Sequence, residues 1–235
     1  MKEPSTSKTT FPITKLVYSF FYLLFIPVLL FVVAGDWRWL EGWIFSAIFV
    51  LGSFGTLLYL YFTDPELLHE RFASPVQEAQ KSWDKVLLLV FVFEFLVWVV
   101  LMPLEKRFGW LGTFPLGPRV AGMVFMLVGF YVLFSALREN TFAAPVVKMQ
   151  KERGQQVIST GPYSVVRHPM YAGATLLFIG GPMLLSSNAG MLLGFVLIVT
   201  IAIRSIGEEA MLKEELPGYR EYMQMVKFRI IPFFF

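Results

Sequence analysis

Two polar segments near the C-terminal end of the chain contain the side chains best suited to bind or transform a ligand. Residues 161–173 read GPYSVVRHPMYAG, and residues 204–209 read RSIGEE. The stretch between them is apolar and has almost no other polar content. Because charged groups are costly to desolvate at a membrane boundary, this concentration of Arg, His and Glu around one apolar stretch predicts a functional site.

The first polar segment leads into a helix, since Pro169 suits a first helical turn, where its missing N–H costs nothing. The free N–H groups of that helix start, together with Arg167 and His168, are predicted to bind an anionic or polar ligand group. A purely structural alternative makes Arg167 and His168 interfacial anchors and places Tyr163 and Tyr171 in an aromatic belt.

In the second polar segment, Arg204 and Glu208 are four residues apart and therefore share one face of a helix. As an exposed pair they would contribute only a few tenths of a kcal/mol, which is the structural alternative. The neighbouring Glu209 argues against it, because adjacent carboxylates at an anionic lipid surface repel each other unless a cation lies nearby. A cationic ligand would relieve this repulsion.

Composition indicates a polytopic membrane protein, since 56% of the residues are hydrophobic, 17% are aromatic and the mean hydropathy is +0.63. The chain has no cysteine, and only His69 and His168 offer imidazole ligands. This argues against a zinc, haem or iron–sulfur site and excludes disulfides. The basic residues lie in loops between the apolar runs, so nucleic-acid binding receives no support.

About six hydrophobic crossings are expected in an all-α protein. Four apolar runs are each close to the twenty residues that cross a hydrocarbon core, and they lie at about 16–34, 44–62, 86–104 and 120–137. The fifth stretch, 172–203, is interrupted by Gly180–Pro182 and Ser186–Asn188, which predicts a tight helical hairpin. Its arms of about 15 residues are short, so we expect local bilayer thinning or a second arm that continues as a polar helix.

The distribution of basic residues predicts the orientation. With six crossings, sixteen of the 20 Lys and Arg fall on the side that holds both termini and the loop 138–171. The positive-inside rule places that side in the cytoplasm. We expect a disordered tail at 1–15, a four-span scaffold at 16–137 and a functional core at 138–235, with the first span retained as an anchor.

Two further polar features are given structural roles. Glu94 lies inside the third span, where an ionised carboxylate facing lipid would cost about 2.5 kcal/mol or more, so it must face the bundle. A structural hydrogen bond or a protonated side chain is favoured there over a substrate contact. The segment 64–72, which contains His69, reads as a capped cytoplasmic helix without chemistry.

At the two polar segments the chain resembles the isoprenylcysteine carboxyl methyltransferase family and its bacterial relatives, integral membrane enzymes that use S-adenosylmethionine. The resemblance covers about 138–235. The matching features are G-P-Y-x-x-x-R-H-P-x-Y-x-G at 161–173, Asn188 at the hairpin turn, R-x-x-x-E-E-x-x-L at 204–212, Tyr219, Tyr222 and the closing Arg229–Pro232.

The resemblance implies a cytoplasmic cofactor pocket for S-adenosylmethionine, with S-adenosylhomocysteine as the product. The residues implied for cofactor binding are Gln156, Val157 and Ile158 at adenine, Tyr163, His168, Pro169 and Tyr171 along the cofactor, and Glu208 and Glu209 near its amino group. Arg167 is a further candidate for cofactor binding, because of its place at the helix start. Arg204 and Glu208 are the candidate catalytic residues. This requires His168 and Glu208 to lie close enough to touch one small molecule.

The chemical nature of the methyl acceptor determines which catalytic groups the enzyme needs. A carboxylate acceptor is already ionised, so Arg204 would hold it through a bidentate contact without a general base. An amine acceptor would require a base, and Glu208 or Glu209 would be the candidate. An acceptor with a lipid tail would enter from the bilayer between the spans.

Three other functions remain open. Phospholipid N-methyltransferases share the H-P-x-Y and E-E elements, but their G-x-G pair occurs nowhere in this chain. Membrane sterol reductases carry a similar R-H-P-x-Y segment, use a nicotinamide cofactor and favour R-x-x-x-D-E, whereas this chain has Glu208 with Glu209. A non-enzymatic membrane scaffold or carrier would use the same clusters only as anchors.

Overall fold

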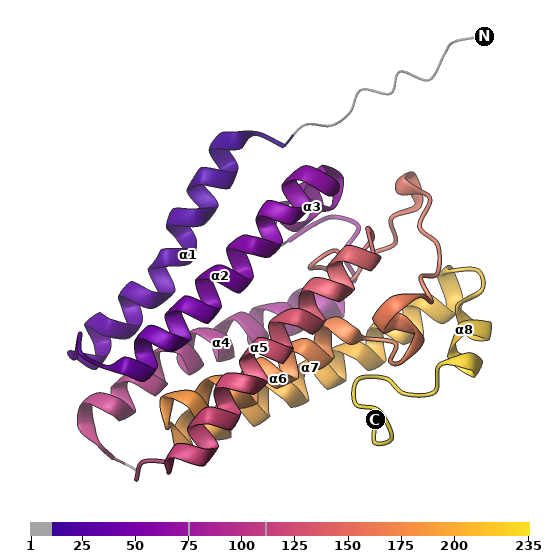
Figure 1. Ribbon diagram of the computed structural model, residues 1–235. Helices are drawn as coiled ribbons and strands as arrows, with labels where there is room; N and C mark the ends of the chain where they lie inside the picture. Colours follow the sequence, from indigo (N-terminus) through magenta and orange to yellow (C-terminus); the bar gives the residue numbers. More distant parts are fainter. Residues whose placement is uncertain (1–10, 75, 111) are drawn as a thin grey trace.

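The computed structural model describes residues 11–74, 76–110 and 112–235, and all of its regular elements are helical. Figure 1 shows them as one elongated bundle, with the loop that precedes α6 and the helix α8 gathered at one end. The α-helices are α1 (Ile13–Ala34), α2 (Leu40–Thr63), α3 (Pro65–Arg71), α4 (Ser82–Phe108), α5 (Leu116–Glu139), α6 (Pro169–Leu185), α7 (Asn188–Glu215) and α8 (Tyr219–Met225). Two short 3₁₀ turns, η1 (Lys151–Arg153) and η2 (Gly161–Ser164), lie in the loop between α5 and α6.

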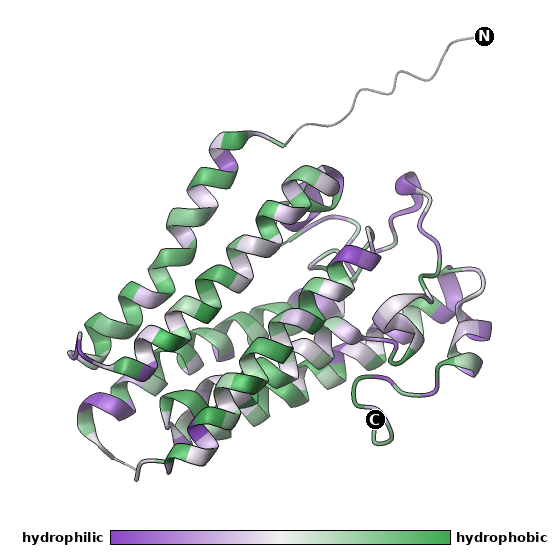
Figure 2. Cartoon of the chain, in the orientation of Figure 1, coloured by the Kyte–Doolittle hydropathy of each residue, from purple (hydrophilic) through white to green (hydrophobic). Residues whose placement is uncertain are grey.

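The membrane spans agree with the pattern of apolar residues. Within the described residues, the helices α1, α2, α4, α5 and α7 are long and apolar enough to cross a membrane, and α6 is a shorter apolar helix. Figure 2 shows hydrophobic residues over the long helices and hydrophilic ones at their ends. The prediction of an all-α, multi-pass membrane protein is therefore confirmed. Helix α1 begins at Ile13, which lies within the segment 1–15 predicted as a tail. The first ten residues of that segment lie outside the described part of the chain.

The predicted hairpin is formed by α6 and α7, but its turn is shorter than expected. Helix α6 runs without a break through Gly180–Pro182 and ends at Leu185. The chain reverses at Ser186, whose φ of 60° is left-handed, and at Ser187, whose hydroxyl accepts a hydrogen bond from the Gly190 N–H. Gly180–Pro182 is therefore not a turn. The second arm does continue, since α7 has 28 residues and carries the polar segment on its last turns.

Two carboxylates inside the bundle hold α7 against α4. Glu105 is 3% exposed and accepts hydrogen bonds from the Ser187 hydroxyl (2.6 Å) and from the backbone N–H groups of Asn188 and Ala189. It thereby satisfies donors at the start of α7 that have no partner in the helix itself. Glu94 accepts a hydrogen bond from Thr200 at 2.8 Å, which confirms that it faces the bundle and makes a structural hydrogen bond.

Helices α5 and α6 pack closely because glycines from both lie at their interface. A Cβ atom built on Gly122 would lie 2.7 Å from the carbonyl oxygen of Gly180, and one on Gly173 would lie 2.8 Å from that of Gly129. The two pairs are seven residues apart on each helix, so they form one seam along an antiparallel contact. Small residues are favoured at such contacts in membranes, because attraction there depends on close packing.

We expect Gly122→Ala to destabilise the protein by about 1–3 kcal/mol, the usual cost of overpacking. The added methyl group would lie 2.5 Å from the backbone nitrogen of Leu184, and backbone cannot move aside as a flexible side chain can. Gly55→Ala in α2 is the matched control, since a Cβ there meets nothing within 4 Å. Thermal unfolding in detergent compares the two variants, and equal melting temperatures would mean that the α5–α6 seam tolerates expansion.

Candidate functional site

The end of the bundle that carries the polar segments contains a cavity of about 350 Å³. Its walls come from α4, α5, α6, α7, α8, the end of α3 and the loop between α5 and α6. One part of the lining is apolar and includes Leu88, Phe91 and Ile201 from the spans, while the rest is mixed with polar and charged groups. The cavity is therefore amphipathic and falls in the usual size range for small-molecule sites.

Most of the sequence-predicted site residues line this cavity. The ones that do are Gln156, Val157, Ile158, Tyr163, Arg167, His168, Pro169, Tyr171, Arg204 and Glu208. Glu209 is not among the lining residues and is 1% exposed. The two adjacent carboxylates of α7 thus lie in different surroundings, with Glu208 at the cavity and Glu209 buried beside it.

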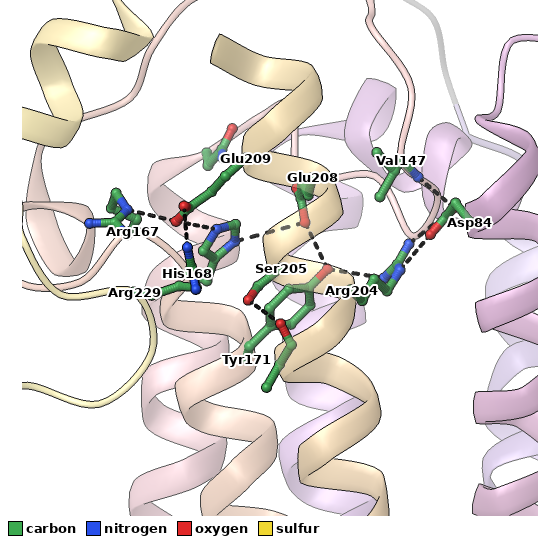
Figure 3. A network of polar contacts seen from close by, with 12 residues as sticks. Asp84, Val147, Arg167, His168, Tyr171, Arg204, Ser205, Glu208, Glu209 and Arg229 are labelled. Atoms are coloured by element: carbon green, nitrogen blue, oxygen red, sulfur yellow. Dashed lines mark hydrogen bonds and ion pairs between the residues drawn. The ribbon is translucent and has the colours of Figure 1, made fainter. Parts of the chain in front are cut away.

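Glu209 is held by three cationic or potentially cationic side chains (Figure 3). Arg167 donates to it from Nε at 2.6 Å, Arg229 donates from Nη2 at 2.9 Å, and His168 Nε2 lies 3.2 Å away. Charge-assisted hydrogen bonds of this kind are about twice as strong as neutral ones. The like-charge repulsion expected from the Glu208–Glu209 pair is thus offset by the protein's own cations.

The same cluster fixes the C-terminal segment over the start of α6. The Nη1 atom of Arg167 donates to the carbonyl oxygens of Val226 and Lys227, at 2.8 and 2.7 Å. The backbone N–H groups of Arg167 and His168 donate to the carbonyls of Phe228 and Arg229. The start of α6, the end of α7 and the C-terminal segment are therefore one connected unit.

The carboxylate of Glu208 faces the cavity between His168 and Tyr171. It accepts a hydrogen bond from the Tyr171 hydroxyl at 2.8 Å, and His168 Nδ1 lies 3.8 Å from it. The two predicted segments therefore meet in one place, as a shared ligand requires. No Lys or Arg pairs with Glu208 within the part of the chain that the structure describes, which leaves its charge available to a cationic ligand group.

The sequence spacing suggests that Arg204 pairs with Glu208, but its partners in the structure are different. Its Nε donates to Asp84 at 2.7 Å, its Nη2 donates to the Pro145 carbonyl oxygen at 2.8 Å, and its Nη1 donates to the Tyr171 hydroxyl at 3.1 Å. The described residues contain no Arg204–Glu208 ion pair. A bidentate contact to an acceptor would therefore require Arg204 to leave Asp84.

Asp84 is a member of this network that sequence reasoning missed. It is fully buried at the start of α4 and also accepts hydrogen bonds from Gln80 and from the Val147 N–H. In the sequence it looks like an ordinary acidic residue in the first turn of a helix. Its role becomes visible only in the folded structure, which brings it next to Arg204, 120 residues further along the chain.

Tyr163 closes the cavity on the side of the loop. Asn140 donates a hydrogen bond to its hydroxyl at 3.1 Å, and the Tyr222 hydroxyl donates to its carbonyl oxygen at 2.7 Å. Burial raises the pKa of Tyr163 well above its ordinary value, so its hydroxyl stays protonated. It is therefore a neutral hydrogen-bonding group and not a base.

An amphipathic cavity at the end of a bundle of membrane spans, with buried ion pairs on one wall, defines an integral membrane protein with a small-molecule site. Residues 118–217 match the family model described as phospholipid methyltransferase. The chain is 27% identical over 142 residues to protein-S-isoprenylcysteine O-methyltransferase B of Arabidopsis thaliana. The aligned region covers 59% of this chain and 68% of that protein. Both matches support the resemblance to membrane methyltransferases seen in the polar segments.

Proposed function

We propose that the protein transfers a methyl group from S-adenosylmethionine to the carboxylate of a lipid-like acceptor of the isoprenylcysteine type. The observation that carries this proposal is the meeting of His168 and Glu208 in a cavity whose walls pass from apolar residues of the spans to polar residues of the loop. The name of the Arabidopsis relative supports the acceptor class. We also propose that the cavity faces the cytoplasm, because sixteen of the 20 Lys and Arg lie on its side.

The lining residues fit the proposed cofactor. Val157 and Ile158 offer an apolar surface to a purine ring beside the amide of Gln156, and Glu208 offers a negative charge to a positively charged group. When bound, S-adenosylmethionine supplies a methyl group on a positively charged sulfur. The contribution of the protein is then to orient the acceptor, to exclude water and to accommodate the change in charge.

Separate roles follow for the remaining residues. Arg167, His168 and Glu209 hold the wall of the cavity in shape, and Arg167 and His168 also line it. Arg204 keeps the Tyr171 hydroxyl directed at Glu208 and retains one Nη1 hydrogen for an acceptor oxygen. A carboxylate acceptor is ionised at neutral pH, so no general base is required.

An N-methylating phospholipid enzyme is the second candidate, and the description of the matching family model favours it. The chemistry of the product separates the two. Membranes containing the protein are incubated with S-adenosylmethionine carrying a radiolabelled methyl group, and the labelled lipid or peptide is identified. We expect a label that mild base releases, as from a methyl ester. A base-stable label on a lipid amine would replace the proposal by N-methylation.

Cofactor binding tests the methyl-donor assignment itself. We expect calorimetry on the detergent-purified protein to detect binding of S-adenosylmethionine and S-adenosylhomocysteine. Stabilisation by NADPH in a thermal shift assay, with no binding of either methionine derivative, would instead favour a reductase. Binding of none of these three compounds would favour a membrane scaffold or carrier.

A further inference from the structure

Arg71 is the last residue of α3, a helix to which the sequence assigned no chemistry, and its side chain lines the cavity. It is partly buried, and its Nη1 donates one hydrogen bond, to the carbonyl oxygen of Ala143 at 3.0 Å. A guanidinium has five N–H donors in a planar fork. Arg71 therefore brings an additional cation with unused donors to the wall of the cavity.

The other cations of the cavity wall all have acidic partners. Lys148 lies 2.7 Å from Glu70, and Arg167 and Arg204 lie 2.6 and 2.7 Å from their carboxylates. Within residues 11–74, 76–110 and 112–235, no carboxylate oxygen lies within 4.0 Å of the Arg71 nitrogens. Among the cations that line the cavity, Arg71 is thus the one whose charge no described carboxylate compensates.

An uncompensated cation at a partly buried site is costly, because burial removes water without supplying a counter-charge. Burial lowers the pKa of the Arg71 guanidinium, which is the expected effect of removing water from a charged group. A ligand anion would remove the cost. Among anions, carboxylate and phosphate groups match the planar fork of arginine, which binds them through two parallel hydrogen bonds.

We infer that Arg71 is the carboxylate-binding residue of this cavity. The inference rests on the proposed function, which supplies two carboxylates: the one on the methionine part of the methyl donor and the one on the acceptor. It differs from the expectation based on sequence, in which Arg204 held the acceptor, because Arg204 is already engaged by Asp84 and Pro145. Arg71 makes no comparable ion pair with the described residues.

Arg71 and the free negative charge of Glu208 border the same cavity. Both side chains line it together with Tyr163, so one ligand volume meets a positive and a negative group. Glu208 suits an ammonium or sulfonium group, and Arg71 suits a carboxylate. Together they provide the charge pattern that a zwitterionic amino acid group requires.

A structural role for Arg71 is the alternative that an experiment must separate. Helix α3 also holds the loop through Glu66, which lies 3.3 Å from Arg153, and through the pair of Glu70 with Lys148. The hydrogen bond from Arg71 to Ala143 belongs to the same contact between helix and loop. Glu66→Gln weakens this contact without changing a lining residue of the cavity, so it is the matched control.

The test measures affinities of wild type, Arg71→Gln, Arg71→Lys and Glu66→Gln for S-adenosylmethionine and for its decarboxylated analogue. If Arg71 binds the donor carboxylate, Arg71→Gln weakens binding of S-adenosylmethionine by about tenfold or more, the usual scale for a hydrogen bond to a charged group. Binding of the decarboxylated analogue then stays within about twofold of wild type, since the group that Arg71 contacts is missing. Arg71→Lys keeps the charge but loses the fork, so its affinity falls between the two.

If Arg71 binds the acceptor carboxylate, both affinities are unchanged and KM for N-acetyl-S-farnesylcysteine rises about tenfold or more in Arg71→Gln. Unchanged affinities and unchanged KM in both Arg71 variants, or equal effects in Glu66→Gln, would overturn the inference. If Arg71→Gln also fails to bind the decarboxylated analogue, the pocket of that variant has not folded. The affinities and KM of Arg71→Lys, compared with those of wild type, then test the inference. Wild-type protein that binds neither compound would instead refute the proposed function, and the inference with it.

Discussion

Glu208→Gln is expected to weaken binding of S-adenosylmethionine by about tenfold or more while the protein remains folded. The Glu208 carboxylate faces the cavity, and its protein partners are the Tyr171 hydroxyl and the more distant His168 Nδ1. Glutamine keeps an oxygen that can accept the Tyr171 hydrogen bond but removes the negative charge. The loss therefore reports on the attraction between Glu208 and a cationic ligand group, and calorimetry on the detergent-purified protein measures it.

Two further variants define what this result means. Glu214→Gln removes an exposed carboxylate from the same helix and is expected to change the affinity by less than about twofold, because exposed charges interact weakly through water. Arg204→Lys is expected to bind the methyl donor normally and to transfer the methyl group slowly, since lysine cannot hold Asp84 and Tyr171 together. Equal donor affinity of wild type and Glu208→Gln would remove Glu208 from the cofactor site.

The difference between Glu208 and Glu209 shows what the sequence could not determine. Adjacent residues on an α-helix point about 100° apart, so two neighbouring carboxylates need not both face the same cavity. Which one does depends on how α7 is rotated against its neighbours, and that rotation is set by packing between distant segments. The motif therefore located the site, but it did not separate the exposed carboxylate from the buried one.

The membrane spans were predictable because each is a continuous apolar run whose length is set by the bilayer. The hairpin was predictable from the turn residues Ser186–Asn188, which interrupt the last apolar stretch, and it helps to bring His168 and Glu208 to one end of the bundle. Asp84 and Arg71 were not predictable, because each acts through the long-range packing of α4 or α3 against the loop between α5 and α6. Their local sequences are ordinary helix termini.

Glu209→Gln is expected to be the most destabilising single change in the site, costing about 3–5 kcal/mol. The buried carboxylate is contacted by Arg167, His168 and Arg229, so its neutralisation leaves two guanidinium groups without their counter-charge. For a protein of this size that corresponds to a loss of on the order of 10 °C in melting temperature. Thermal unfolding in detergent measures the effect, with Glu208→Gln at the neighbouring position of the motif as the comparison.

The same substitution is expected to release the C-terminal segment, because Arg167 binds Glu209 and the carbonyls of Val226 and Lys227 with a single guanidinium. Trypsin should then cut faster after Lys227 and Arg229 than in wild type. Adding Arg229→Gln removes one of the two uncompensated cations, so the double variant should be less destabilised than the sum of its single changes. A Glu209→Gln protein with wild-type melting and wild-type proteolysis would show that Glu209 does not hold this segment, and its ion pairs would then be neutral to stability.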